Sequence, residues 1–384
     1  MVPESARSRV EPFHVMDVFA AAAARQVQRG DVLSLAAGQP STRAPQPVLD
    51  AMHSALDSHL LGYSETLGIA PLREEVARYH SDRYGIDVDA ADVVITTGSS
   101  GAFSLLFLAA FDVGDTVVMA RPGYPAYRNT LQALGCDVIE LDCGSDVRFQ
   151  PTVAMLDALP TPPKGLIVAS PANPTGTVIE PAELAALARW CESRGTLLIS
   201  DEIYHGISYG DTVTSSAWET SRESVVVGSV SKYFSMTGWR LGWMLLPRSL
   251  TRAVQRLASN MTVCPPTTSQ VAAIAAFTDE SRAELDGHVR RYAVNRQILL
   301  EALPTLGITD LAPADGAFYA YADIAHLTDD SLSWCAEMLD QTGVSLAPGI
   351  DFDTGRGAHT VRFSFAGATA DIEEAIARLR SSLG

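Results

Sequence analysis

Residues 93–101 read Val-Val-Ile-Thr-Thr-Gly-Ser-Ser-Gly, an apolar run that passes into a segment of glycine and hydroxyl side chains. The run predicts a strand over Val93–Thr96, and the pattern of Gly101–Phe111 predicts a helix after it. A continuous apolar run, without alternation, is typical of a strand buried on both faces. The turn between them brings backbone N–H groups, two hydroxyls and the positive end of a helix together. Such a turn is a natural cradle for a phosphate group.

The same alternation of short strand and helix continues on the C-terminal side of this segment. Helices are predicted over Ala126–Leu134 and Pro181–Ser193, the second with proline at its first position. Six further strands are predicted at Thr116–Ala120, Asp137–Leu141, Leu166–Ser170, Leu197–Ser200, Val225–Ser229 and Gly242–Leu246. The pattern predicts an α/β fold with a mostly parallel seven-stranded sheet and helices on both faces. The last run follows its predecessor too closely for a crossover helix, so we expect it to be antiparallel.

The two ends of the chain have a different pattern. An alanine-rich helix is predicted over Val15–Gln28, a long helix over Ser281–Leu303 and a final helix over Asp371–Ser382. Strand patterns occur in the C-terminal part at Ala317–Tyr321, Val344–Ala347 and Thr360–Ser364. We therefore predict a large domain over residues 45–280 and a smaller α+β domain built from residues 1–44 and 281–384.

Composition excludes several classes of protein. The chain has 384 residues, of which 47% are hydrophobic and 19% charged, as in a globular protein with an ample core. Its net charge of −17 disfavours nucleic acid as a partner, and no apolar stretch is long enough to span a membrane. The N-terminal residues carry charges of both signs and do not resemble a secretory signal. The five cysteines show no C-x-x-C spacing, so we predict a cytoplasmic protein without a metal site or a disulfide framework.

Ligands of open parallel sheets bind beyond the carboxyl ends of the strands, so the residues that follow each strand are the candidates for a site. Tyr124, Asn173, Asp201, Lys232 and Arg240 all lie shortly after a predicted strand. Each has an ordinary structural explanation when taken alone, such as a helix cap for Asp201 or a solvated loop lysine for Lys232. Together they provide an aromatic plate, an amide, a carboxylate, an amine and a guanidinium at one edge of one sheet. These are the groups that a protein needs to bind a phosphorylated aromatic aldehyde.

A lysine-containing run and three shorter motifs resemble those of a known family. The run Ser229-Val-Ser-Lys-Tyr-Phe-Ser-Met-Thr-Gly-Trp-Arg-Leu-Gly242 resembles the lysine signature of class I aminotransferases. Asn173-Pro-Thr-Gly176, Asp201-Glu-Ile-Tyr204 and Val361-Arg-Phe-Ser-Phe-Ala366 resemble the family's other motifs and occur in the family's order. The chain thus resembles class I/II aminotransferases of the aspartate aminotransferase superfamily, which are fold type I enzymes that use pyridoxal 5'-phosphate. The resemblance covers nearly the whole chain.

The resemblance implies a role for each matching residue. Lys232 would hold the cofactor covalently and move the substrate proton, and Asp201 would keep the pyridine nitrogen protonated. The implied catalytic residues are Lys232, Asp201 and Tyr204. The implied cofactor-binding residues are Ser99, Ser100, Gly101, Tyr124, Asn173, Asp201, Tyr204, Ser229, Lys232, Arg240 and Tyr63. The implied substrate-binding residues are Gly38, Asn173 and Arg362, the last as the partner of the α-carboxylate. Tyr63 would reach the phosphate of a neighbouring subunit, which implies a homodimer with shared active sites.

The substrate is not defined by these motifs. No arginine outside the implied set is identifiable as a partner for a side-chain carboxylate, and the segment from Phe13 to Ala37 is rich in alanine, valine and leucine. We therefore expect a tolerant amino acid aminotransferase that accepts aspartate, alanine, valine or similar donors, with 2-oxoglutarate or pyruvate as acceptor. A carbon–sulfur β-lyase with the same cofactor is an open alternative. A DNA-binding regulator is disfavoured because the chain has little basic surface for DNA. A nicotinamide dehydrogenase is disfavoured because no G-x-G-x-x-G follows the first strand of the sheet.

Overall fold

The computed structural model describes residues 2–383, and its largest sheet has seven strands. All seven lie where the sequence predicts them, within one residue at each end. In sheet order they are β2 (Val93–Thr96), β8 (Gly242–Leu245), β7 (Val225–Ser229), β6 (Leu197–Asp201), β5 (Gly165–Ala169), β3 (Thr116–Arg121) and β4 (Asp137–Asp142). Strands β3 to β7 pair in parallel, and β8 runs antiparallel to both of its neighbours. The predicted α/β class and the antiparallel last strand are confirmed.

Both faces of this sheet are covered, which explains why its strands read as continuous apolar runs. Val117 and Ile167 pack in one hydrophobic cluster together with helices α4 (Gly98–Ala110), α5 (Pro125–Leu134) and α8 (Arg248–Met261). Their sequence neighbours Val118 and Leu166 pack in another cluster, with α3 (Ala70–Tyr84) and α7 (Pro181–Arg194). Consecutive side chains therefore enter opposite cores.

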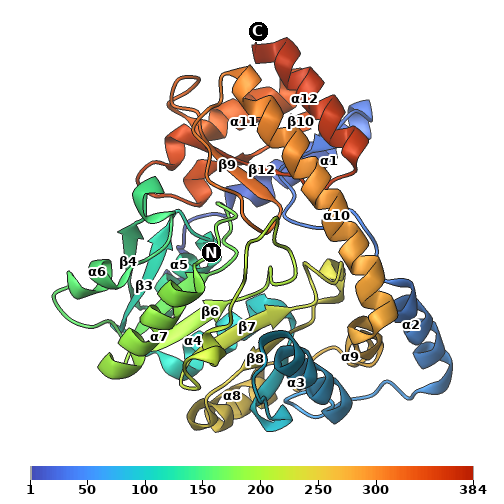
Figure 1. Ribbon diagram of the computed structural model, residues 1–384, viewed down its shortest axis with the longest axis vertical. Coiled ribbons are helices and arrows are strands. Elements are labelled where there is room, and N and C mark those ends of the chain that lie inside the picture. The colour runs from blue at the N-terminus through green and yellow to red at the C-terminus, as the bar shows by residue number, and fades with distance from the viewer. Residues whose placement is uncertain (1, 384) are drawn as a thin grey trace.

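A second group of strands is built from the ends of the chain (Figure 1). Strands β11 (Ala347–Pro348), β12 (Thr360–Ser364) and β9 (Tyr319–Asp323) form an antiparallel sheet, and β1 (Leu33–Ser34) pairs in parallel with β10 (Val344–Ser345). The strand predicted at Val344–Ala347 is thus two short strands. They differ because Val344 pairs with Leu33, whereas Ala347 pairs with Arg362 in the other sheet.

The helices of the chain ends cover these strands. They are α1 (His14–Arg29), α11 (Ser331–Thr342), α12 (Thr369–Leu383) and the long α10 (Asp279–Ala302). Figure 1 shows α10 running from α2 (Gln46–Ser58) and α9 (Thr267–Ala273) to the neighbourhood of α12. A short helix, α6 (Val153–Asp157), follows β4. The division of the chain at residues 45 and 280 stays a prediction. Across residues 2–383, none of the helices combines the length and the apolar character that crossing a bilayer requires.

Candidate active site

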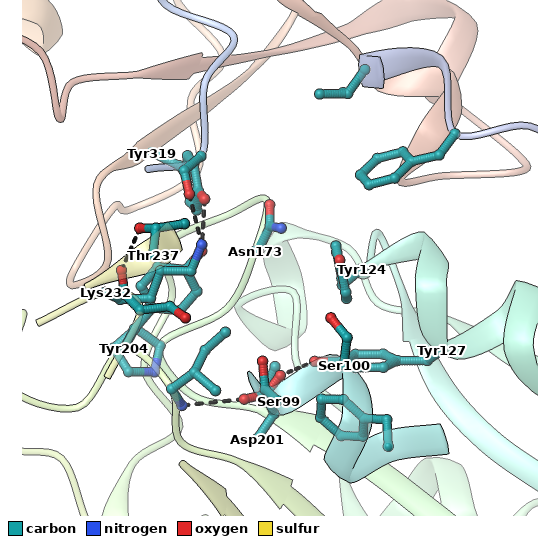
Figure 2. Close-up of a pocket in the computed structure, with 18 of the residues that line it drawn as sticks. Ser99, Ser100, Tyr124, Tyr127, Asn173, Asp201, Tyr204, Lys232, Thr237 and Tyr319 are labelled. Carbon is teal, nitrogen blue, oxygen red and sulfur yellow. Dashed lines mark hydrogen bonds between the residues drawn. The ribbon is translucent and has the colours of Figure 1, made fainter. Parts of the chain in front are cut away.

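A cavity of about 190 Å³ opens where strands β5, β6 and β7 end, the edge at which the sequence predicts a site. Its lining includes residues that directly follow these strands, and the N-terminal segment closes it from the other side. Figure 2 shows Asp201 and the two serines that open α4 at the base of the cavity and Tyr319 at its upper rim. Ten predicted site residues line it: Gly38, Ser99, Ser100, Tyr124, Asn173, Asp201, Tyr204, Lys232, Arg240 and Arg362.

Three predicted residues are not part of this lining. Gly101 lies within the first turns of α4, behind the two serines. The hydroxyl of Ser229 bonds to Leu241 O at 3.1 Å and to Ser231 Oγ at 2.8 Å, and Ser231 lines the cavity instead. Tyr63 lies on a surface loop with 88% of its area exposed.

Asp201 is a buried carboxylate held by two donors. The hydroxyl of Tyr127, three residues after Tyr124 on α5, donates a hydrogen bond to Oδ2, and the backbone N–H of Ile203 donates to Oδ1 at 3.2 Å. Burial raises the pKa of Asp201 to about 6, although both hydrogen bonds and the nearby Lys232 oppose this shift. The carboxylate therefore gains strongly from a cation placed beside it.

Lys232 presents its amine to the cavity. Its Nζ donates a hydrogen bond to the carbonyl oxygen of Gly38 at 2.6 Å and lies 5.5 Å from the centre of the Tyr204 ring. Burial and the charge of Arg362 lower the pKa of Lys232 to about 8. Near neutral pH a much larger share of this amine is therefore neutral than of an ordinary lysine, and the neutral form is the one that acts as a nucleophile or a proton acceptor.

An anion site lies at the start of α4. Gly98 has a φ of +68°, and a Cβ at this position would lie 2.6 Å from Nη2 of Arg240. Only glycine allows the guanidinium to approach the helix N-terminus this closely. The hydroxyls of Ser99 and Ser100 line the cavity beside it. A helix N-terminus, hydroxyl donors and a guanidinium together fit a phosphate group.

Arg362 is fixed from several directions at the opposite side of the site. Its Nη1 donates to Asn173 Oδ1 at 2.8 Å, and its Nη2 donates to Ala36 O at 2.6 Å. The guanidinium carbon lies 4.3 Å from the centre of the Tyr319 ring and 4.8 Å from that of Phe352. Its buried Nε has no hydrogen-bond partner among residues 2–383. A buried, preoriented guanidinium with an unused donor fits a carboxylate ligand.

Three phenols near the cavity remain protonated. Burial raises the pKa of Tyr124 to about 12 and that of Tyr204 and Tyr319 above the ordinary value. The hydroxyls of Tyr204 and Tyr319 bond to each other at 2.6 Å. Each can therefore act as a hydrogen-bond donor within the site.

Two tyrosines of the site region, Tyr127 and Tyr319, were not predicted from the sequence. Tyr127 lies in the helix predicted over Ala126–Leu134, but Tyr124 precedes that helix, so the prediction did not place the two rings together; in the structure Tyr124 is the N-cap residue of α5. Tyr319 lies in a predicted strand, but nothing in that strand's pattern indicates that it opposes Gly38. A Cβ on Gly38 would lie 2.5 Å from the Tyr319 hydroxyl, so the loop carrying Gly38 passes directly over it.

The residues present fit pyridoxal 5'-phosphate. The cavity offers an anion cradle at one end, a buried carboxylate that favours a cationic partner, an amine of lowered pKa, and the guanidinium of Arg362, which fits a carboxylate. These match the phosphate, the ring nitrogen, the aldehyde and the carboxylate of an amino acid substrate.

Comparisons with known proteins agree with this chemistry. Residues 30–379 match the model of the family described as aminotransferase class I and II, and the chain belongs to this family. It is 57% identical to the valine–pyruvate aminotransferase of Mycobacterium tuberculosis over 378 residues, which are 98% of this chain and 97% of that protein. It is 32% identical to the aspartate/prephenate aminotransferase of Thermus thermophilus over 378 residues, which are 98% of this chain and 97% of that protein. A crystal structure of an aminotransferase from Mycobacterium tuberculosis matches with a TM-score of 0.98 and 56% identity, covering 100% of this chain and 99% of the other.

The protein is therefore an amino acid aminotransferase of fold type I that uses pyridoxal phosphate. The predictions of the family, the enzyme class and the cofactor are confirmed. The family and these relatives favour amino-group transfer over the carbon–sulfur β-lyase reaction.

Proposed function

We propose that the enzyme takes its amino group from small and aliphatic amino acids, valine and alanine in particular, and transfers it to a 2-oxo acid such as pyruvate. The observation that carries this proposal is the apolar wall of the cavity, formed by Phe13, Val15, Met16 and Phe19 of the N-terminal segment. Within residues 2–383 the lining contains three basic side chains, and the proposed roles below use all three. This chain's own lining then has no basic side chain left for an acidic donor. The name of the relative that shares 57% identity, valine–pyruvate aminotransferase, supports the same donor.

We propose that Asp201 and Lys232 carry the chemistry. Bound at this site, pyridoxal phosphate supplies an electron-withdrawing ring that makes the α-proton of an attached amino acid acidic. Asp201, ionised and oriented by Tyr127, holds a proton on the ring nitrogen. Lys232 would hold the cofactor covalently at rest; the substrate's amino group would displace it, and the freed Nζ would then accept the proton from the substrate's α-carbon. The pKa of Lys232, about 8, favours this role because the neutral amine is accessible near neutral pH.

The remaining polar residues orient the cofactor. Ser99, Ser100 and Arg240 line the cavity and hold the phosphate, with the start of α4 as an additional donor, whereas Gly101 and Ser229 lie outside the lining. Tyr124 stacks on the ring. Asn173 and Tyr204 donate to the ring's phenolic oxygen. This role for Asn173 is supported by its bond to Arg362, which uses Oδ1 and leaves the amide N–H groups available.

Arg362 and Gly38 bind the substrate's α-carboxylate in this proposal. The guanidinium is already fixed by Asn173 and Ala36, so little conformational entropy is lost when a carboxylate binds. Because every amino acid and every 2-oxo acid presents this group, Arg362 serves both halves of the reaction.

We also propose a cytoplasmic homodimer. Tyr63 is exposed in one chain and lies outside that chain's cavity, as expected of a residue that reaches the phosphate site of a partner. The exposed Leu60 beside it is consistent with a covered surface. Five free cysteines support a reducing compartment. Sedimentation at equilibrium should give twice the mass of one chain, and Tyr63→Phe should weaken cofactor binding; a monomer would contradict the proposal.

Half-reactions with single donors test the choice of substrate. The holoenzyme is mixed with valine, alanine or aspartate, and the change in the absorbance of the bound cofactor is followed. Apolar contacts separate donors by about 1–3 kcal/mol per methylene, so valine and alanine should both react, with rate constants within about a few hundredfold. Aspartate should react more slowly than either. Conversion of aspartate alone would overturn the proposal.

A pair of variants sharpens this test. Met16→Arg places a cation in the apolar wall and should raise the rate with aspartate relative to valine. Val27→Arg adds the same charge on the same helix, at a residue that is 89% exposed and lies outside the cavity lining, and should leave the ratio unchanged. Equal effects of the two variants would mean that the wall does not select the donor.

A further inference from the structure

Helix α1 begins without a cap of its own. Phe13 precedes the helix in an extended conformation, and its phenyl ring has no atom that could accept a hydrogen bond. The first N–H groups of a helix need acceptors from outside it. Here a single distant carboxylate supplies two: Asp351 Oδ1 accepts from His14 N at 2.9 Å, and Oδ2 accepts from Val15 N at 2.7 Å. A carboxylate is well placed at the positive end of a helix.

Asp351 belongs to a segment that also touches the substrate side of the cavity. Its carboxyl is buried, with 2% of the residue exposed. The next residue, Phe352, lies against the guanidinium of Arg362. The carbonyl of Phe352 accepts a hydrogen bond of 2.8 Å from Gly123 N, directly before Tyr124. The start of α1 is thus held by the same short segment, Asp351 and Phe352, that contacts Arg362 and the turn preceding Tyr124.

The first turns of α1 form the apolar wall of the cavity. Phe13 contacts the edge of Tyr124, with ring centres 5.9 Å apart and planes at 77°. Val15 packs in a small hydrophobic cluster with Phe352 that is separate from the two large cores. A small cluster holds a helix end less firmly than a large one, so the two hydrogen bonds to Asp351 matter for its position.

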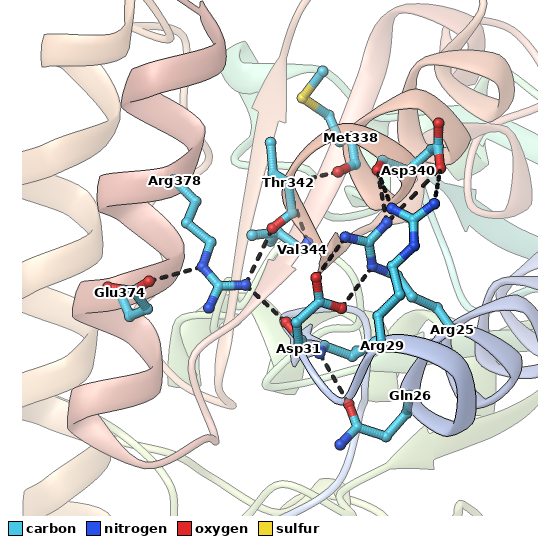
Figure 3. Close-up of polar contacts among 11 residues, drawn as sticks. Arg25, Gln26, Arg29, Asp31, Met338, Asp340, Thr342, Val344, Glu374 and Arg378 are labelled. Carbon is cyan, nitrogen blue, oxygen red and sulfur yellow. Dashed lines mark hydrogen bonds and ion pairs between the residues drawn. The ribbon is translucent and has the colours of Figure 1, made fainter.

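The other end of α1 is anchored independently (Figure 3). Arg25 donates to both carboxylate oxygens of Asp31, at 2.8 and 2.7 Å, and to the carbonyl of Asp340 on α11 at 2.6 Å. Arg378 on α12 donates to the carbonyl of Asp31 at 2.7 Å. These bonds lie away from the cavity. If the bonds to Asp351 were lost, α1 would stay attached here while its cavity end became free to move.

We propose that Asp351 is a positioning residue for donor selection, which holds the first turn of α1 so that Phe13, Val15, Met16 and Phe19 close the cavity over an apolar side chain. The inference rests on the proposed function in one respect, namely that this wall contacts the donor. Asp351 itself does not line the cavity.

Two variants break the same contact from opposite sides. Asp351→Asn replaces one acceptor by an NH₂ group that faces an N–H donor. His14→Pro removes one donor at the first helical position, where proline is well tolerated, and leaves Asp351 in place. Asp353→Asn is the matched control, because Asp353 is equally buried but bonds to Gly355 N, Arg356 N and the guanidinium of Arg121, and not to α1.

Two readouts on the holoenzyme separate the possibilities. Amide hydrogen exchange should become at least about tenfold faster in residues 15–20 of both variants and stay unchanged in residues 25–31. The KM for valine should rise about tenfold, which corresponds to the free energy lost with one hydrogen bond to a charged group. The kcat should change by less than about twofold. Asp353→Asn should show neither effect.

These measurements distinguish a wrong role for Asp351 from a wrong choice of donor. If the wild-type enzyme does not react with valine, the proposed donor is wrong, and the KM comparison is made with the donor that reacts best. Unchanged exchange in both variants would overturn the role of Asp351. Faster exchange with unchanged KM would overturn it equally, since α1 would then move without consequence for the donor. Should Asp351→Asn fail to fold, His14→Pro alone decides between these results.

Discussion

Replacement of Arg362 by lysine should weaken the reaction of every donor by a similar factor, whatever its side chain. The guanidinium is buried, bonded to Asn173 and Ala36, and lies against two aromatic rings. It is therefore held in one orientation before any substrate arrives. A lysine amine is a point charge on a flexible stem, and it cannot keep both anchoring bonds while donating two parallel bonds to a carboxylate.

The magnitude follows from the hydrogen bonds that lysine cannot make. A hydrogen bond to a charged group contributes about 1.5–3 kcal/mol, and a bidentate pair adds geometric specificity. Retention of the positive charge preserves part of this energy. We expect a net loss of about 2–3 kcal/mol, which is about 30- to 150-fold in kcat/KM.

Kinetics with valine, alanine and the acceptor oxo acid provide the assay. Arg362→Lys should lower kcat/KM for all three by similar factors and leave the ratio of valine to alanine within about threefold of its wild-type value, because the apolar wall is untouched. Arg356→Lys, at a half-exposed arginine paired with Asp142, is the control and should be silent. A loss confined to one donor would refute the assignment of Arg362 to the shared α-carboxylate.

Three further outcomes are expected. Asp201→Asn should retain cofactor and lose transamination by orders of magnitude, since an amide cannot stabilise the ring proton; near-normal turnover would refute this role. Gly98→Ala should weaken cofactor binding at least about tenfold in equilibrium dialysis, because its Cβ would lie 2.6 Å from Arg240 Nη2, whereas Gly85→Ala, at a similar φ of +65° in open space, should not. Glu202→Gln should flatten the pH dependence of stability. Burial raises the pKa of Glu202 from 4.5 to about 8, so the folded state keeps a proton that the unfolded state has lost, and wild-type stability should fall with rising pH across this window. The decline relative to Glu202→Gln should be about 1.4 kcal/mol per pH unit in urea unfolding, and parallel curves would contradict it.

The large sheet could be predicted almost completely from the sequence. Runs such as Val93–Thr96 are buried on both faces, so hydrophobicity alone marks their bounds. The short strands of the chain ends were less predictable, because Val344 and Ala347 belong to different sheets although they are three residues apart. Their pairing depends on partners far away in the sequence, which no local pattern contains.

The candidate site divides in the same way. Asp201 and Lys232 follow strands that end at one sheet edge, so the topology itself predicts that they meet. Tyr319 and Asp351 enter the site region through the packing of the C-terminal part against the N-terminal segment. Asp351 caps a helix that begins 337 residues earlier in the chain, and such a contact is visible only in three dimensions. Roles that depend on another subunit, such as that of Tyr63, stay predictions.

The central claim is that this cavity is the active site and that Lys232 is its covalent anchor for the cofactor. The chain contains only one other lysine, Lys164, directly before β5. Borohydride reduction of the holoenzyme followed by peptide mapping should place the cofactor on Lys232 in stoichiometric amount. Lys232→Arg should bind no cofactor covalently. Recovery of the label on Lys164, or covalent labelling that persists in Lys232→Arg, would contradict the assignment of the site.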